Sequence, residues 1–258
     1  MPDAATLAQM YGPEYLATWY PPQQDSQAPS PAVEMPAAPS QNDRVAAWLK
    51  KARHGTFLDY GCGAGHLLRE AMRLHWQAVG VELDAEVAAS VAQRTGARVV
   101  SEPALLGQEP LADVLHLGDV LEHLTDLDHQ VPAMLGLLKP NGLLLAQGPL
   151  ENNFNVFTLT LRLARSWRGA ECAERAPYHV LLATARGQRE LFRRCGLREV
   201  EFSVSEVAWP APRRLSRPEL RRPRSVGLFV LRRLSQAISR LVSRRWGNRY
   251  FYAGRWAG

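Results

Sequence analysis

The sequence has 258 residues, of which 46% are hydrophobic and 22% charged, with 31 Lys and Arg against 25 Asp and Glu. This length suits one α/β domain with additions, and no apolar run is long enough to span a bilayer. The 3 cysteines form no CxxC pair, which argues against a disulfide framework. The first 20 residues lack the pattern of a secretory signal, so we expect a cytoplasmic protein.

The positive charge is concentrated in the C-terminal part. From Ala211 onward the chain has 13 arginines and one acid, Glu219, whereas the rest has 18 basic and 24 acidic residues. We therefore expect any anionic partner to bind the C-terminal segment.

The main domain is predicted at residues 43–206, after two segments without a core pattern. Residues 1–20 are rich in aromatic side chains and are expected to fold over the active site as a lid. Residues 21–42 are rich in Pro, Ala, Gln and Ser, which is typical of a flexible linker.

Strand-like and helix-like stretches alternate through this domain. A first helix is predicted at 43–53, strands at 56–60, 78–83, 98–101, 113–117 and 143–147, and helices at 66–76, 85–94 and 127–138. The turn sequence Lys139-Pro140-Asn141-Gly142 is predicted to separate the last helix from the fifth strand. The strands are apolar throughout, so we predict a doubly wound, mostly parallel α/β sheet with its ligands at the carboxyl ends of the strands.

The pattern loosens after residue 150. Residues 156–167 have helical spacing, 185–195 is a predicted helix, and 199–205 is an alternating strand with which a final strand, 249–256, can pair. The basic insertion between these strands, 207–248, contains an amphipathic helix with apolar residues on one face and arginines on the other. Two interpretations stay open: the helix packs on the domain, or it attaches to an anionic membrane surface; nucleic acid is less favoured.

The first strand runs directly into a glycine-rich turn and a helix. Residues 61–65 read Gly-Cys-Gly-Ala-Gly, which allows a tight turn and a close approach of the backbone to a ligand. His66 stands where a dinucleotide-binding turn has its third glycine. Asp59, two residues before the turn, would repel a pyrophosphate but attract an ammonium or sulfonium cation.

The second strand ends at Glu82, roughly 20 residues beyond the turn, where an acid can accept hydrogen bonds from both hydroxyls of a ribose. Asp84 is the predicted N-cap of the next helix.

Four motifs in this order resemble the class I S-adenosylmethionine-dependent methyltransferases, in a branch with ubiquinone-type O-methyltransferases and bacterial tailoring enzymes. They are Asp59–Gly65, Gly80–Glu82, Asp113–Leu124 and Leu138–Gly142. The resemblance covers residues 53–200 and implies a Rossmann-like sheet of seven strands with S-adenosylmethionine as the cofactor.

The resemblance also implies which residues contact this cofactor. Glu82 and Leu83 would border the ribose, Glu102 would face the adenine, and Gly118 and Asp119 would border the cofactor. The methionyl end would be held by Asp59, Gly61, Cys62, Gly63 and Gly65.

The implied reaction is an in-line methyl transfer, with O-methylation favoured, to a small-molecule, glycan or lipid-linked acceptor. His123 and His179 are the candidate general bases, although hydrogen bonding in a loop or at a helix end also explains them. The sequence shows no metal-ligand cluster and predicts no oligomeric state. A nicotinamide-dependent oxidoreductase and a non-catalytic, membrane-associated scaffold remain alternatives, and attachment to the inner membrane face remains a hypothesis.

Overall fold

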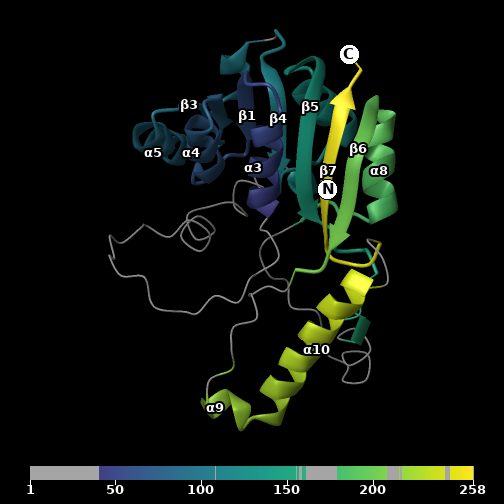
Figure 1. Cartoon of the computed structure of the whole chain (residues 1–258). Helices are drawn as coiled ribbons and strands as arrows, with labels where there is room; N and C mark the ends of the chain where they lie inside the picture. Colours follow the sequence, from purple (N-terminus) through teal and green to yellow (C-terminus); the bar gives the residue numbers. More distant parts are fainter. Residues whose placement is uncertain are drawn as a thin grey trace.

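The computed structural model describes residues 41–107, 109–154, 156, 159–160, 179–207, 215, 217–241 and 245–257. Its strands form one sheet of seven in the order β3-β2-β1-β4-β5-β7-β6 (Figure 1). The first five are parallel, and β7 runs antiparallel between β5 and β6, which confirms the predicted fold. The strands are β1 (Thr56–Tyr60), β2 (Gln77–Val81), β3 (Arg98–Val100), β4 (Ala112–Gly118), β5 (Leu138–Pro149), β6 (Leu197–Ser205) and β7 (Arg249–Trp256).

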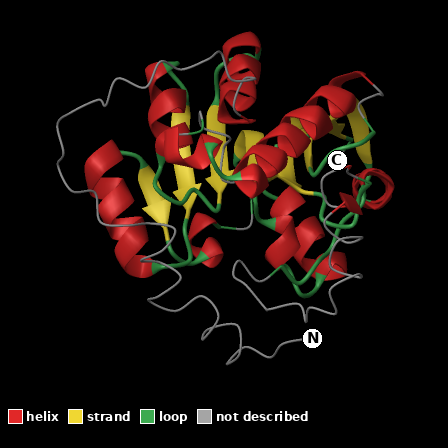
Figure 2. Ribbon diagram, turned by 90° about the horizontal axis from the view of Figure 1, so that it is seen from below, coloured by secondary structure: helices red, strands yellow, loops and turns green. Residues whose placement is uncertain are grey.

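Helices cover both faces of this sheet (Figure 2). One face packs against α3 (Gln41–Lys51), α4 (His66–Arg73) and α5 (Ala85–Thr95). The other face packs against α6 (Leu127–Leu135) and α8 (Ala185–Arg194). Successive residues of one strand enter opposite cores, as Val114 and Leu115 of β4 do, so the strands need apolar residues at every position.

The crossover from β3 to β4 is unusually short. Where the other parallel crossovers carry an α-helix, the described part of this one has only the 3₁₀ helix η1 (Pro103–Leu106). A cavity of about 340 Å³ lies between η1, Tyr60 and α6.

Several predicted boundaries are wrong. The second strand ends at Val81 rather than at residue 83, and the helix predicted at 127–138 ends at Leu135. The fifth strand already begins at Leu138 and runs through the expected turn, because the chain bulges between the pairs Ala112–Leu138 and Val114–Leu143. Asn141 takes the left-handed conformation (φ 61°) in this bulge. Helix α4 ends at Arg73 rather than at Trp76, which is buried in the core.

The predicted helix of the basic insertion is α10 (Pro223–Leu241), preceded by the short α9 (Arg217–Leu220). It lies between β6 and β7 in the chain and projects from the end of the sheet at which β5 terminates (Figure 1). In the described part of the chain no helix combines the length and apolar character needed to cross a membrane. The predicted lid at 1–20, most of the linker at 21–42 and most of the predicted helix at 156–167 lie outside the described residues.

Candidate active site

The glycine turn after β1 has the conformation that only glycine adopts easily. Gly61, Gly63 and Gly65 have φ values of 79°, 49° and 75°. A Cβ on Gly61 would lie 2.8 Å from Cγ2 of Val120, which follows β4. The N–H groups of Gly61 and Cys62 both donate to the carbonyl of Val81, at 2.8 and 2.9 Å, and so tie the turn to the end of β2.

Cys62 fills space beneath this turn. Its side chain is buried, and burial together with the nearby carboxylates of Asp59 and Glu82 raises the pKa of the thiol. The thiol is therefore held in its neutral form, which argues against a role as a nucleophile.

Glu82 lies just beyond β2 and faces the turn. One carboxylate oxygen accepts a hydrogen bond from the N–H of Gly63 at 3.0 Å, and the other accepts from Asp84 at 3.3 Å. A carboxylate has about four acceptor positions, so roughly two remain for the hydroxyls of a ribose. Burial raises the pKa of Glu82. Asp84 caps α5 as predicted, accepting from Val87 at 2.9 Å.

The residues expected beside the cofactor differ widely in exposure. Leu83 is 73% exposed and Glu102, at the start of η1, is also exposed. Leu83 follows β2 and Glu102 follows β3, which are neighbouring strands. The N–H of Glu82 donates to the carbonyl of Val100 and links the two strand ends. Glu102 precedes the cavity beneath η1, and its contact with adenine stays a prediction.

Asp59 is less accessible than its position in the sequence predicts. It is only 3% exposed, and Oδ1 lies 2.6 Å from Nδ1 of His116 on the neighbouring strand β4. Nε2 of His116 is buried without a partner in the described part of the chain. The ring lies against Gly118, where a Cβ would be 2.5 Å from Cε1. Asp59 thus holds His116, and a direct contact with a cofactor cation stays a prediction.

The chain turns sharply after β4. Asp119 has the left-handed conformation (φ 54°), which is uncommon for residues other than glycine and is often found at functional sites. Its N–H donates to Gln147 at 3.0 Å and its carboxylate pairs with Arg249. The 3₁₀ helix η2 (Leu121–His123) follows immediately.

The loop before α8 crosses η2 and brings two histidines together. The carbonyl of Glu122 accepts hydrogen bonds from Val180 and Leu181, at 2.9 and 3.1 Å. The rings of His123 and His179 are consequently 5.1 Å apart. Nδ1 of His179 lies 2.5 Å from Oε1 of Glu151, which follows β5.

A buried carboxylate completes this group. Glu122 is 4% exposed, and burial, followed by the charge of Asp119, raises its pKa well above the ordinary value. A carboxylate oxygen of Glu122 and one ring nitrogen each of His123 and His179 all lie within 4.8 Å of one another. The fold therefore joins both predicted bases and adds two carboxylates, Glu122 and Glu151, to them. The pair Glu122-His123 after a strand was the only sequence signal for the first, and nothing local marked the second.

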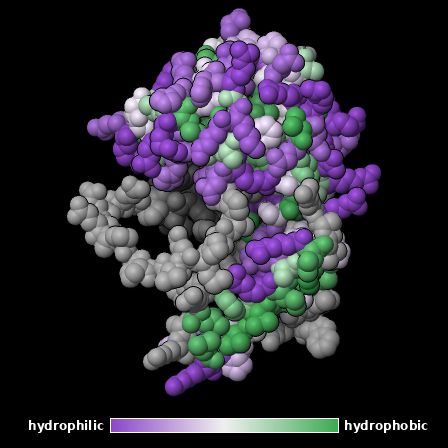
Figure 3. Space-filling view, viewed as in Figure 1, coloured by the Kyte–Doolittle hydropathy of each residue, from purple (hydrophilic) through white to green (hydrophobic). Residues whose placement is uncertain are grey.

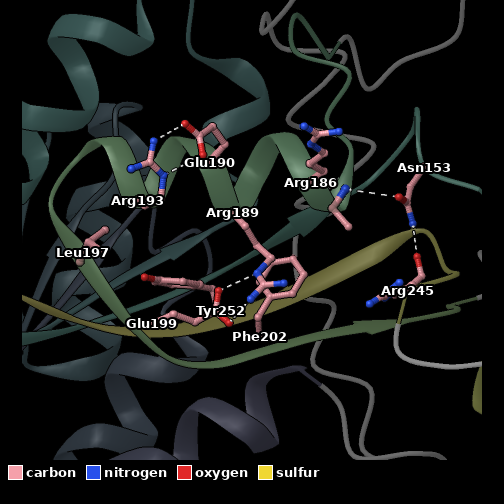
Figure 4. A pocket seen from close by; sticks show the side chains of 11 residues that line it. Asn153, Arg186, Arg189, Glu190, Arg193, Leu197, Glu199, Phe202, Arg245 and Tyr252 are labelled. Carbon is pink, nitrogen blue, oxygen red and sulfur yellow. Dashed lines mark hydrogen bonds and ion pairs between the residues drawn. The ribbon is translucent and has the colours of Figure 1, made fainter.

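A larger cavity, of about 840 Å³, lies at the β6 side of the sheet, between α8 and the antiparallel pair of β6 and β7. Figure 4 shows Arg189 of α8 reaching down to Glu199, at 2.6 Å, beside Phe202 and Tyr252. Because β6 and β7 are separated from β1 by β4 and β5, this cavity is not the site formed by the glycine turn.

Residues 37–201 match the model of the methyltransferase domain, and the chain belongs to this family. It is an S-adenosylmethionine-dependent methyltransferase, with S-adenosylmethionine as its cofactor, which overturns the nicotinamide alternative. The left-handed glycines, the acceptor positions of Glu82 and the closeness of Val120 to the turn fit this cofactor. No curated protein matches the chain.

Several solved structures share the fold. Phosphoethanolamine N-methyltransferase 2 from Haemonchus contortus, in complex with S-adenosyl-L-methionine, is 18% identical (TM-score 0.53; 84% of this chain and 52% of that chain covered). Magnesium protoporphyrin IX methyltransferase from Synechocystis, with bound SAH, is 13% identical (TM-score 0.51; 83% and 81%). The cyclase SpnF is 17% identical (TM-score 0.51; 83% and 80%). The fold therefore does not determine the acceptor.

Replacing Glu82 by Ala should weaken the binding of S-adenosylhomocysteine at least about tenfold. The change removes a charged acceptor whose hydrogen bonds contribute on the order of 1.5–3 kcal/mol each, and a factor of ten corresponds to about 1.4 kcal/mol. Calorimetric titration measures the dissociation constant. Glu86→Ala, in the first turn of α5, is the matched control and should bind like the natural chain. Equal affinities of Glu82→Ala and the natural chain would place the ribose elsewhere.

Proposed function

We propose that this methyltransferase methylates an oxygen atom of a small-molecule, glycan or lipid-linked acceptor that binds beside η2. The observation that carries the proposal is the hydrogen-bonded pair of His179 and Glu151 next to His123. This group lies near the glycine turn, because Val120 just before η2 occupies the space that a Cβ on Gly61 would need.

An oxygen acceptor explains why a histidine and a carboxylate stand together here. A hydroxyl group must lose its proton to become a good nucleophile, whereas a neutral amine attacks with its lone pair. Glu151 engages Nδ1 of His179 and leaves Nε2 to take a proton, which is the arrangement of a general base oriented by a third group.

The remaining residues position the reactants. The cofactor supplies a sulfonium-bound methyl group, and the chain places the acceptor oxygen in line with it. The glycine turn and Glu82 bind the cofactor on one side of the site, and η2 with His179 lies on the side of the acceptor.

Methyl transfer tests this proposal directly. S-adenosylmethionine with a labelled methyl group is incubated with simple phenols, with amines and with a polar lipid extract. We expect labelled methyl ethers, and His179→Ala should lower kcat by about 10²–10⁴ because it removes the base. His129→Ala changes an exposed histidine of α6 that pairs with Asp126, and should leave kcat unchanged. Products labelled only on nitrogen would contradict O-methylation.

The outward face of α10 indicates that the protein attaches to a membrane surface and binds its acceptor there. The helix turns serines toward the domain: Ser235 bonds to Glu206 at 3.2 Å and Ser239 to the carbonyl of Trp246 at 2.5 Å. Its opposite face is apolar and open, with Val230, Leu234 and Leu241 exposed by 55%, 52% and 83% (Figure 3).

Arginines border this apolar strip. Arg233 and Arg240 are exposed and lie along one side of it at helical spacing. An apolar strip flanked by cations suits the interface of an anionic bilayer, where the strip enters the headgroup layer and the cations meet lipid phosphates. The helix projects from the edge of the sheet that holds the active site, so a membrane there would present a lipid-linked acceptor to it (Figure 1).

Co-sedimentation with vesicles tests this part of the proposal. We expect binding to phosphatidylglycerol-containing vesicles, weaker binding as salt rises because each Arg contributes only about 1 kcal/mol, and little binding to pure phosphatidylcholine. Leu234→Glu with Leu241→Glu should abolish binding, whereas Leu105→Glu, an equally exposed position on η1, should not. Natural protein that stays in the supernatant at low salt would refute membrane attachment.

A further inference from the structure

We infer that Glu122, His123 and His179 form a binding site for one divalent transition-metal ion, to which the hydroxyl of the acceptor is a further ligand. The inference rests on the proposed function for the acceptor and on the geometry of this cluster for the ion. One carboxylate oxygen and two imidazole nitrogens lie within 4.8 Å of one another.

The upper limit of 4.8 Å leaves the three ligand atoms within reach of a single metal ion. Ligand atoms at about 2.1 Å from a tetrahedral ion are about 3.4 Å apart, so small side-chain rotations bring the three onto one ion. The backbone supports them, because the loop carrying His179 is fixed to Glu122 by two hydrogen bonds.

Glu151 supplies the support that metal-binding histidines usually have. It engages Nδ1 of His179 at 2.5 Å and thereby directs Nε2 toward the cluster. His179 is mostly buried, with a side-chain exposure of 11%, so the ring has little freedom to turn. A carboxylate, a histidine and a metal ion in this order are a common arrangement in metalloproteins.

The buried carboxylate also favours a cation. Glu122 is 4% exposed and lies near the carboxylate of Asp119, which itself pairs with Arg249. Burying a second carboxylate beside the first is costly unless a positive charge offsets it. Arg249 offsets part of this negative charge, and a divalent ion bound by Glu122 would offset the rest.

The donor set indicates which ions fit. Two imidazoles with one carboxylate suit Zn²⁺, Fe²⁺, Co²⁺ or Ni²⁺ better than Mg²⁺ or Ca²⁺, which prefer oxygen ligands. Three protein ligands leave positions open, as in metal sites that also bind a substrate.

An ion here changes the role of the two histidines from bases to ligands. The ion makes the acceptor hydroxyl more acidic, so its proton passes to solvent water. The oxygen then forms the new C–O bond as the C–S bond breaks, and the electron pair of that bond stays on sulfur. Nε2 of His179 binds the ion when the ion is present and takes the acceptor proton, as in the proposed function, when it is absent.

Calorimetric titration of the chelator-treated full chain with CoCl₂, together with the visible absorption of Co²⁺, tests the inference. We expect one ion per chain and absorption bands typical of nitrogen ligands. His179→Ala should weaken binding at least about tenfold, and Glu151→Gln should weaken it about 10–100-fold through His179. His129→Ala, which changes an exposed histidine, should bind as tightly as the natural chain.

Binding of S-adenosylhomocysteine serves as the second measurement. It should stay within about twofold for each variant, which shows that the variants are folded and keeps the cofactor site separate from the metal site. No stoichiometric Co²⁺ binding to the natural chain, or equal Co²⁺ affinity of His179→Ala and the natural chain, would overturn the metal site. If the natural chain does not bind S-adenosylhomocysteine, the proposed function is overturned instead.

Discussion

Two backbone hydrogen bonds fix the position of the glycine turn after β1. Gly61 and Cys62 donate to one carbonyl, that of Val81, and so hold the end of β1 against the end of β2. This places the N–H of Gly63 on Glu82. The missing side chain of Gly61 also leaves room for Val120, so η2 and its histidine can approach the turn. The glycine turn and the segment that leads into η2 thus meet at Gly61.

The local parts of this arrangement follow from the sequence, and the contacts between distant segments do not. A glycine-rich turn, an acid after the second strand and Asp84 as an N-cap each depend on neighbouring residues only. The partner of Asp59 is His116, 57 positions later, and Glu151 meets His179 across 28 positions. Such pairs depend on strand order and loop packing, which no periodicity encodes.

The helix of the insertion shows a related limit. Periodicity identifies α10 as amphipathic, but it does not say which face meets the protein. The face with Ser235 and Ser239 is turned inward. Glu206, which follows β6, and the carbonyl of Trp246, which precedes β7, accept hydrogen bonds from these serines. The apolar strip is left exposed (Figure 3), and the helix projects from the end of the sheet at which β5 terminates (Figure 1). An acidic domain with a basic, partly apolar attachment is consistent with an acceptor held at an anionic surface.

A crystal structure of the chain with S-adenosylhomocysteine is the most direct test of where the cofactor binds. The ligand should lie along residues 61–65, with both ribose hydroxyls within hydrogen-bond distance of Glu82 and its sulfur facing η2. The glycine turn should keep its left-handed conformation when the ligand binds. Density for the ligand in the cavity between α8 and β6, or a ribose without contact to Glu82, would contradict this placement.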